Sequence, residues 1–250
     1  MLWFFMATIE LAFQPSPLEG APPPLAANAI HVWRLQLHDM PETLLLAREE
    51  EERAARMRHE PSRHVFLHTR TMLRRILALY TGRPAEALPI VISEQGKPSL
   101  KDENAPCFNL SHSGQMGLIA ITRAAPVGVD LEMLRDVTRP DRIAKTYFTP
   151  SEQAALASLP ESQQLDAFHA CWTRKEAYVK ATGKGIANQL ASFDVTLLPD
   201  QPAQICAIDG HAQKAQATTL HVFRPRHDAW AAVCALCADM ELLGFEPDPG

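Results

Sequence analysis

The pattern of hydrophobic and polar positions predicts the same order of elements twice along the chain. The first set comprises a strand at 31–37, helices at 44–57 and 64–80, and strands at 89–93 and 116–122. The second set comprises a strand at 127–132, helices at 141–147, 151–159 and 165–181, and strands at 193–198, 219–223 and 229–236. Such elements are stable only when their apolar faces pack together. We therefore expect an α+β protein with two similar halves packed together and a cleft between them.

The two longest predicted helices carry similar local sequences. Each contains Thr-Arg, at Thr69-Arg70 and at Thr173-Arg174, and each ends in Thr-Gly. Glycine accepts the left-handed conformation that closes many helices, so Gly82 and Gly183 are the predicted C-terminal caps. The sequence echo is short, and the repeated order of elements is the stronger indication of two related halves.

The halves are predicted to span residues 29–125 and 126–238, with a further segment at each end. The chain starts with an apolar run, but Glu10 interrupts it and no basic segment precedes it, which argues against a signal peptide or a membrane span. Five prolines between positions 15 and 24 then favour an extended linker. We interpret residues 1–28 as a flexible leader, with Met6 as an alternative start, and residues 239–250 as a tail.

Composition and charge narrow the class of protein. Hydrophobic residues make up 46% and charged residues 21%, as in ordinary globular proteins. A net charge of −5 without a basic stripe argues against a nucleic-acid binder. Five cysteines, an odd number without regular spacing, fit a reducing compartment better than a disulfide framework. We expect a soluble cytoplasmic protein with neither membrane nor nucleic acid among its partners.

Two acidic residues alternate with apolar ones on the strand that opens the second half. Side chains two apart on a strand point to the same face, so Asp130 and Glu132 project together while Val129 and Leu131 face a core. Two carboxylates on one face repel each other unless a cation or a shared proton lies between them. The pattern alone fits a metal site and a solvated sheet edge about equally well.

The helix at 165–181 offers a third carboxylate and a lysine. Glu176 and Lys180 are four residues apart and share a helix face, with Trp172 one turn earlier on the same stripe. Alone, this pattern is typical of a surface ion pair. Together with Asp130 and Glu132 it suits Mg²⁺ and a phosphate-bearing substrate, because magnesium is usually held by one or two carboxylates, phosphate oxygens and waters. Lysine can supply a compact positive charge for the phosphate.

A third polar cluster, Phe108-Asn109-Leu110-Ser111-His112-Ser113-Gly114, suits a loop that grips a phosphate, although an ordinary turn has the same composition. Ser111 lacks the Gly-x-Ser-x-Gly context of a hydrolase nucleophile. Gly96-Lys97-Pro98 is not a phosphate-binding Walker loop, because Val91 stands where that motif needs its first glycine. A serine hydrolase and a P-loop enzyme are therefore disfavoured.

These clusters together resemble the 4′-phosphopantetheinyl transferases, specifically their long, surfactin-synthetase-activating type. The motifs that carry the resemblance follow in order: Gly96-Lys97-Pro98, Phe108 to Ser113, Gly128-Val129-Asp130-Leu131-Glu132, Phe148-Thr149-Pro150-Ser151-Glu152, Trp172-Thr173-Arg174-Lys175-Glu176-Ala177, Lys180, and Gly183-Lys184-Gly185. Each motif is weak by itself, but their order and spacing make the set specific. The resemblance covers about Glu50 to Ile186.

The resemblance implies a pseudo-dimeric monomer whose cleft binds coenzyme A as co-substrate and Mg²⁺ as cofactor. Asp130, Glu132 and Glu176 would bind Mg²⁺ together with the pyrophosphate, and Lys180 would contact the phosphates. Glu176 would be the candidate base for the incoming serine, with a water at or near the metal as the alternative. Glu176 and Lys180 are thus the predicted catalytic residues.

The remaining coenzyme A contacts are also implied by the resemblance. Ser111 and His112 would hold the 3′-phosphate and nearby groups, and Lys97 with Pro98 would lie along the adenosine-phosphate side. Arg53 falls about where the family places a basic residue for the 3′-phosphate. That helix aligns poorly, and the other two candidates in it are Arg56 and Arg58.

The predicted function is transfer of 4′-phosphopantetheine from coenzyme A to a serine of an apo acyl or peptidyl carrier protein, with release of 3′,5′-ADP. A basic cluster after the acidic strand is the expected docking site for the carrier: Arg135, Arg139, Arg142 and Lys145. The alternative is a non-catalytic protein that binds coenzyme A or carrier proteins. Such a protein would need the phosphate-gripping residues but not the carboxylates and Lys180.

Overall fold

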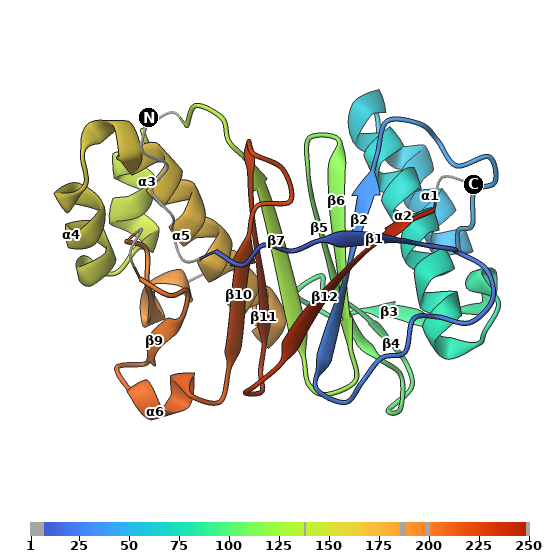
Figure 1. Cartoon of the computed structure of the whole chain (residues 1–250). Helices are drawn as coiled ribbons and strands as arrows, with labels where there is room; N and C mark the ends of the chain where they lie inside the picture. The colour runs from blue at the N-terminus through green and yellow to red at the C-terminus, as the bar shows by residue number, and fades with distance from the viewer. Residues whose placement is uncertain (1–7, 138, 186–188, 199–200, 249–250) are drawn as a thin grey trace.

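The computed structural model describes residues 8–137, 139–185, 189–198 and 201–248, so Met6 and Ile186 lie outside the described residues. Two β-sheets form the middle of the molecule, and helices cover them at opposite ends (Figure 1). The predicted α+β class and the pairing of two similar halves are confirmed. No helix in these ranges combines the length and apolar character that a bilayer crossing needs.

The first half follows the predicted order with two additional strands, β4 (Pro98–Leu100) and β5 (Cys107–Ser113). Its other strands are β2 (Ala29–Gln36), β3 (Ile90–Ile92) and β6 (Met116–Thr122). Its helices are α1 (Arg48–Arg56) and α2 (Glu60–Thr81), followed by a single 3₁₀ turn, η1 (Ala85–Ala87). Leu73, Ile76 and Leu77 of α2 are fully buried against Trp33 and Leu35 of β2, as the apolar periodicity of this helix predicts.

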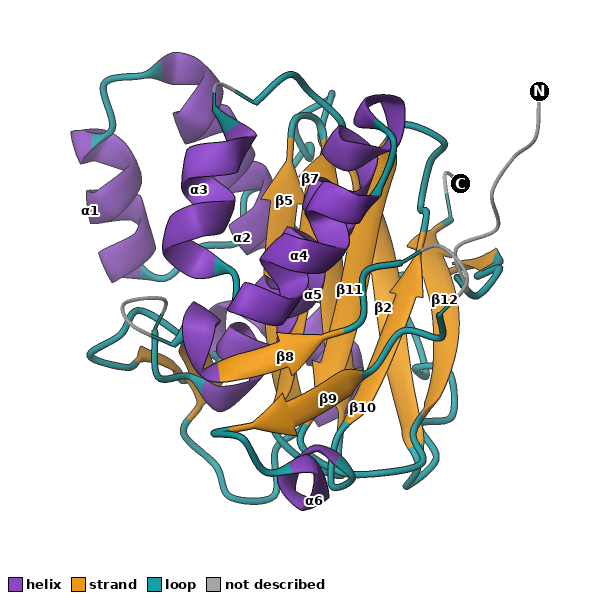
Figure 2. Cartoon of the chain, turned by 90° about the vertical axis from the view of Figure 1, so that its left-hand side faces the viewer, coloured by secondary structure: helices purple, strands orange, loops and turns teal. Residues whose placement is uncertain are grey.

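The second half repeats this plan. Its strands are β7 (Val127–Met133), β8 (Phe193–Val195), β9 (Ile205–Ile208), β10 (Thr219–Phe223) and β11 (Ala229–Ala235). Its helices are α3 (Pro140–Tyr147), α4 (Pro150–Ser158), α5 (Glu161–Thr182) and α6 (Ala212–Ala215), with a 3₁₀ turn, η2 (Leu190–Ser192). Helices α4 and α5 cover the sheet on one side, as Figure 2 shows. Both long helices end as predicted, at Gly82 and Gly183 in the left-handed conformation, with φ of 66° and 68°.

The strand order shows that the two halves have equivalent sheets. The larger sheet has the order β1-β12-β2-β6-β5 and the smaller one β10-β11-β7. In each half, the second strand of the last hairpin pairs antiparallel with the first strand of that half, β6 with β2 and β11 with β7. A shared apolar core joins the sheets, with Val32 and Leu118 from the first half and Val129 and Val233 from the second.

The two ends of the chain differ from the expected leader and tail. Phe13–Ser16 forms β1, and β12 (Glu241–Pro247) lies between β1 and β2, parallel to both. Ile9 N also donates to Val222 O of β10, so this segment contacts both halves. These strands contain Pro15, Gly244 and Pro247, and proline and glycine are uncommon inside strands, so the sequence pattern does not predict them. Gly244 is required by packing, because a Cβ there would lie 2.5 Å from the Ala12 carbonyl oxygen.

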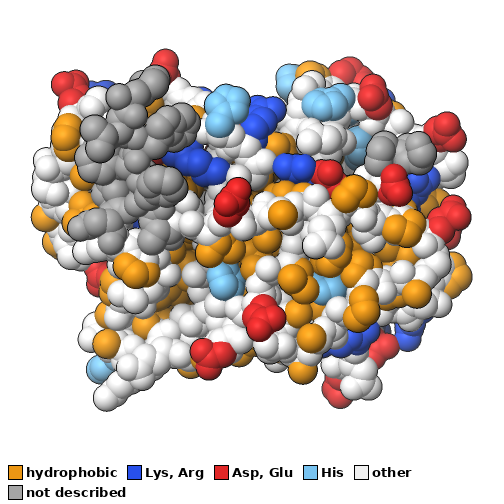
Figure 3. All heavy atoms as spheres, viewed as in Figure 1, with side chains coloured by type: hydrophobic (Ala, Val, Ile, Leu, Met, Phe, Trp, Pro, Cys, Tyr) orange, Lys and Arg blue, Asp and Glu red, His pale blue; other side chains and the backbone are white. Residues whose placement is uncertain are grey.

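The face on which β1 and β12 lie is shown in the space-filling view. Apolar side chains lie there between scattered charged groups, and the visible Lys and Arg side chains do not gather into one stripe (Figure 3). Across the whole chain, acidic residues outnumber Lys and Arg by 29 to 24. Charged side chains gather instead at the junction between the two halves.

Candidate active site

Strand β7 places its acidic residues as the alternation predicts. Val129 and Leu131 are fully buried in the shared core, while Asp130 and Glu132 lie on the opposite face, toward α5. The side chain of Asp130 is itself buried, with 4% of its surface exposed. A carboxylate this deeply buried has to be paired or hydrogen-bonded.

Helix α5 supplies the partner of Asp130. Lys180 Nζ lies 2.6 Å from Asp130 Oδ1 and donates a second hydrogen bond to Ser111 Oγ at 3.0 Å. Ser111 Oγ in turn donates to the same Asp130 oxygen at 3.1 Å. Three residues from three separate sequence motifs therefore meet at one point, and Ser111 belongs to the other half. The sequence placed Asp130 and Lys180 in one charged set, whereas Ser111 was expected at the 3′-phosphate with His112 and lies here beside Asp130 instead.

A glycine allows β7 and α5 to approach this closely. A Cβ at Gly128 would lie 2.1 Å from the Ala177 carbonyl oxygen and 2.3 Å from the Ala181 nitrogen. These distances are far below any normal contact, so a larger residue would push the helix away from the strand. Gly128 thus brings Lys180 within reach of Asp130, which is two residues further along β7.

The carboxylates form a region of excess negative charge. Burial, Asp130 and Glu132 raise the pKa of Glu176 to about 7, against the opposing effect of Lys180. Burial and Asp130 likewise raise the pKa of Glu132. The positive charges of Lys180 and Arg135 oppose these shifts, but three carboxyl groups gather here and burial with their mutual repulsion outweighs that opposition at Glu132 and Glu176.

The donor atoms fit a magnesium ion that is completed by substrate and water. Within the described ranges, no three His, Cys, Asp or Glu side chains converge as a preformed metal cage. Asp130 Oδ2, however, is buried and has no hydrogen-bond partner in the described part of the chain. Magnesium typically takes one or two protein carboxylates and keeps waters or phosphate oxygens for the rest. Oxygen donors and surplus negative charge meet that requirement.

The polar cluster at 108–114 is a strand where a loop was expected. Residues Cys107–Ser113 form β5, and alternation sends Asn109, Ser111 and Ser113 to one side. Asn109 Oδ1 accepts a hydrogen bond from Val129 N at 2.9 Å, and Ser113 Oγ accepts one from Met133 N at 3.1 Å. The polar side chains of β5 therefore hold β7 in place across the junction of the two sheets.

His112 points to the other side of β5 and lines a cavity of about 420 Å³ with Arg53 and Arg70. Loss of hydration and the charge of Lys180 lower the pKa of His112. Arg53 lies over the ring of Phe66 at 5.0 Å. The predicted trio for the 3′-phosphate is thereby reduced to Arg53 and His112 here, since Ser111 faces Asp130 on the opposite side of the strand.

A second cavity, of about 350 Å³, lies between the two halves. Its walls include Lys97, Pro98, Lys180 and Gly183, and it shares Arg70 and Leu110 with the first cavity. A cavity is therefore present between the halves, where the sequence predicts a cleft. Another cavity of about 150 Å³, lined by Tyr80, Arg83 and Arg123, contains none of the predicted site residues.

Arg70 is a candidate that the sequence reading did not identify. Its guanidinium lies 3.9 Å from Glu50, yet Nη1 is buried without a hydrogen-bond partner among the described residues. The available signal was a basic residue between the apolar positions of this helix, next to Thr69. Such a residue needs an anionic partner, and the two cavities offer the space for one.

Lys97 lies at the cleft as predicted, but its ammonium is already engaged. Nζ donates to the carbonyl oxygens of Val127, Lys180 and Ala181 at 3.0, 2.6 and 3.0 Å. The contact of Lys97 with coenzyme A phosphates stays a prediction, and in this structure its three donors serve the backbone of the second half.

Comparisons with known proteins agree with the geometry. The model of the 4′-phosphopantetheinyl transferase superfamily matches residues 126–234. The 4′-phosphopantetheinyl transferase HetI of Nostoc sp. is 37% identical over 218 residues, which cover 84% of this chain and 88% of that protein. The 4′-phosphopantetheinyl transferase Sfp of Bacillus subtilis is 29% identical over 164 residues, covering 66% and 72%. A solved structure of apo-ACPS from Chronobacterium ammoiniagenes is 19% identical, with a TM-score of 0.31. The match covers 44% of this chain and 94% of that structure's chain.

Proposed function

The chain belongs to the 4′-phosphopantetheinyl transferase superfamily, and from this premise we propose how its residues perform the reaction. The protein transfers the 4′-phosphopantetheine group of coenzyme A to a carrier protein. The hydroxyl of the carrier serine attacks the phosphorus next to the pantetheine, and 3′,5′-ADP leaves. Such displacements depend mainly on positioning and on stabilising the charge of the phosphate oxygens.

The observation that carries the proposal is the meeting of Lys180, Asp130 and Ser111 beside the cavity that Lys180 lines. Asp130, Glu132 and Glu176 would hold Mg²⁺, which supplies neutralising charge to the pyrophosphate when bound. Lys180 would stabilise the leaving phosphate, held in place by its hydrogen bonds to Asp130 and Ser111. Asp130 Oδ2 is buried and has no hydrogen-bond partner among the residues that the structure describes, which supports the metal assignment.

Glu176 is the proposed acceptor of the serine proton. Its pKa of about 7 lets a large fraction of the groups be unprotonated near neutral pH while they remain good bases. A bound cation lowers the pKa of its own ligands, so this role requires Asp130 and Glu132 to carry most of the metal contact. If Glu176 is a close ligand instead, a neighbouring water takes the proton.

The cavities beside the carboxylates are the proposed site of coenzyme A. Arg53, Arg70 and His112 line the first cavity and suit the 3′-phosphate, because guanidinium groups bind phosphates in a two-pronged geometry. The pyrophosphate would lie in the second cavity near Lys180. Pro98 is buried and lines the wall of this cavity.

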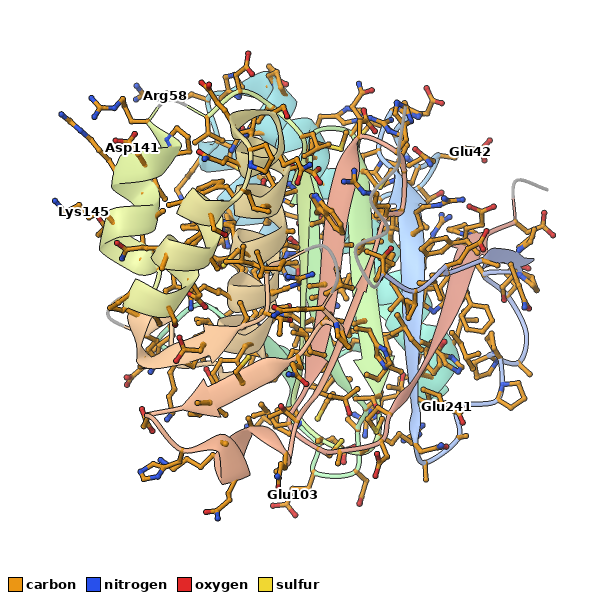
Figure 4. All side chains as sticks on the ribbon, turned by 60° about the vertical axis from the view of Figure 1, so that its left-hand side comes forward. Glu42, Arg58, Glu103, Asp141, Lys145 and Glu241 are labelled. Atoms are coloured by element: carbon orange, nitrogen blue, oxygen red, sulfur yellow. The ribbon has the colours of Figure 1, made fainter. Side chains whose placement is uncertain are left out.

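Helix α3 is the proposed docking site for the carrier. Arg139 is paired with Asp141 at 3.1 Å, whereas the exposed side chains of Arg142 and Lys145 have no ion pair within the described ranges. Lys145 and Asp141 project outward from α3 into solvent (Figure 4). Charges at the edge of an interface act mainly on the association rate. Reversal of Arg142 and Lys145 to glutamate should raise KM for the carrier and leave coenzyme A binding unchanged. The protein is proposed to act as a monomer, since both walls of the cleft come from one chain.

A panel of apo-carriers tests the proposal directly. Purified protein is mixed with coenzyme A, Mg²⁺ and fatty-acid, polyketide or peptide carriers, and the intact masses of the carriers are measured. At least one carrier should gain one phosphopantetheine, and chelation of Mg²⁺ should abolish the gain. A panel without any mass gain would overturn the proposal and favour a non-catalytic binding protein, which needs the cavities but not the charged cluster.

A further inference from the structure

The side chain of Lys97 crosses from one half of the molecule to the other. Lys97 closes the turn between β3 and β4. Ser93 N donates to the Lys97 carbonyl oxygen at 2.9 Å, and Lys97 N donates to Ser93 Oγ at 3.0 Å. From this anchored turn, Nζ reaches carbonyl oxygens of β7 and α5 in the second half. An ammonium group has three donors, and all three are used here.

Two of these carbonyls belong to the last turn of α5, where helical partners are missing. Gly183 N donates to the carbonyl oxygen of Val179. The carbonyl oxygens of Lys180 and Ala181 therefore need donors from outside the helix. Lys97 binds both of them, at 2.6 and 3.0 Å. A positive charge at this position also interacts favourably with the helix dipole. Lys97 is thus a C-terminal cap for α5 that the other half supplies.

The third carbonyl belongs to Val127, the first residue of β7. One ammonium group therefore holds the beginning of β7 and the end of α5 together, beside the close contact at Gly128. Asp130 follows on the same strand, and Lys180 is one of the two capped residues. The 2.6 Å contact between Lys180 Nζ and Asp130 Oδ1 lies directly across this junction.

We propose that Lys97 is a positioning residue for the transfer reaction: it fixes the spacing of β7 and α5, so that Lys180 and Asp130 face each other in the cleft. The inference rests on the proposed function for its kinetic consequence, but the clamp itself is a property of the free protein. Lys97 acts through backbone carbonyls and not by contact with coenzyme A phosphates.

Hydrogen exchange of the free protein tests the clamp without any assumption about activity. Lys97→Met removes the donors and keeps the chain length, and Lys97→Gln restores two donors without charge. Lys101→Met is the matched control, because Lys101 is an exposed lysine just past the same hairpin. Amides at the end of α5, Gly183 above all, should exchange at least tenfold faster in Lys97→Met, less so in Lys97→Gln, and at the normal rate in Lys101→Met. Unchanged exchange at Gly183 in Lys97→Met would overturn the clamp.

Kinetics then distinguish positioning from substrate contact. Misplacement of catalytic groups by about 1 Å can cost roughly 10²-fold in rate. Lys97→Met should therefore lower kcat by tenfold or more while KM for coenzyme A changes less than threefold. In a double variant with Lys180→Met, the Lys97 substitution should have almost no further effect, because Lys180 no longer needs positioning. A raised KM with unchanged kcat, or full additivity, would show direct phosphate binding and refute the inference. Loss of transfer by every variant and by the unmodified protein would instead refute the proposed function, and the exchange result would still decide the clamp.

Discussion

The long helices of the two halves each bury a basic residue that pairs with a glutamate of the preceding short helix, an arrangement called the brace below. The residues that follow this pair in the helix differ between the halves. Arg74 lies eight positions before Gly82 in α2, and Lys175 lies eight positions before Gly183 in α5. Both side chains are buried, with 1% and 0% of their surface exposed. The equivalence extends to their partners, although one residue is an arginine and the other a lysine.

Each basic residue binds the glutamate that caps the short helix before it. Arg74 Nε donates to Glu50 at 2.6 Å, and Glu50 also accepts from Ala47 N at the start of α1. Lys175 Nζ donates to Glu152 at 2.7 and 2.8 Å, and Glu152 accepts from Thr149 N at the start of α4. A backbone carbonyl later in each half also accepts from the basic residue: that of Ala85 in η1 for Arg74 and that of Phe193 in β8 for Lys175.

The halves differ at the residues that follow the brace. In α5 these are Glu176 and Lys180, which face Asp130 on β7. In α2 the equivalent positions are Arg75 and Leu79, and the facing strand β2 supplies aromatic groups. Trp33 Nε1 donates to the Tyr80 hydroxyl at 2.9 Å, beside His31. One scaffold thus supports an apolar packing surface in one half and a charged cluster in the other, and the first half contributes to the site through β5 and the cavity walls.

The largest effect is expected from breaking the brace of the second half. Lys175→Met leaves the Glu152 carboxylate, 2% exposed, without its counter-charge, and such losses cost about 3–5 kcal/mol. Arg74→Met should cost less, because Glu50 is 14% exposed and keeps Arg70 at 3.9 Å. Urea unfolding of both variants measures the difference. A larger loss in Arg74→Met would contradict the idea that burial of the partner sets the cost.

A smaller loss of stability is expected from substituting Gly128, the residue of β7 that contacts the backbone of α5. Gly128→Ala places a methyl group against the helix backbone, and overpacking of this kind costs about 1–3 kcal/mol or more. Gly117→Ala is the matched control on β6, because its Cβ would meet Leu35 at 3.5 Å, an ordinary contact. Gly128→Ala should lose both stability and transfer activity. Wild-type stability in Gly128→Ala, measured by thermal unfolding, would mean that the strand and helix are not held at this distance.

The halves should also respond in opposite ways to pH. The pKa of Glu176 is raised from 4.5 to about 7, so the metal-free folded protein binds the extra proton and loses stability as pH rises through that window. Burial lowers the pKa of His31 from 6.5 to about 4, so the unfolded chain binds the extra proton and stability rises with pH there. Each group can contribute about 1–3 kcal/mol.

Urea unfolding between pH 4 and 8, in the presence of a chelator, separates the two contributions. Glu176→Gln should be more stable than the unmodified protein above pH 7 and should lose the decline. The two windows overlap, from pH 4.5 to 7 for Glu176 and from pH 4 to 6.5 for His31, so the opposite slopes partly cancel in the unmodified protein. His31→Asn should remove the rise and leave a steeper decline of stability with pH. If both substitutions changed the slope in the same direction, one of the two pKa directions would be wrong.

Much of the site could be predicted because it obeys short-range periodicity. Alternation on β7 and the four-residue spacing on α5 give the directions of Asp130, Glu132, Glu176 and Lys180 without knowledge of the fold. The repeated order of elements likewise gives the two halves. These features depend on residues that are close in sequence, where backbone geometry alone decides which side chains share a face.

The features that escaped prediction depend on long-range pairing. The polar run of β5 looks like a loop because its hydrogen-bonding partners, the amides of Val129 and Met133, are about twenty residues away. Strand β12 pairs with β2 over more than two hundred residues of sequence, and its glycine and proline mimic a tail. The hydrogen bonds of Lys97 to the end of α5 likewise join residues more than eighty positions apart. Local patterns do not specify such partners.

The proposed mechanism depends on Asp130, which would bind Mg²⁺ and which holds Lys180 in place. The rate at which an apo-carrier gains phosphopantetheine is measured by intact mass for the unmodified protein, for Asp130→Asn, and for Asp209→Asn, an exposed aspartate paired with Lys214. Asp130→Asn keeps the shape of the side chain but removes its charge, and the loss of one electrostatic anchor commonly costs about 10²–10³ in rate. We expect that loss in Asp130→Asn and an unchanged rate in Asp209→Asn. A rate for Asp130→Asn within a few-fold of the unmodified protein would contradict the account.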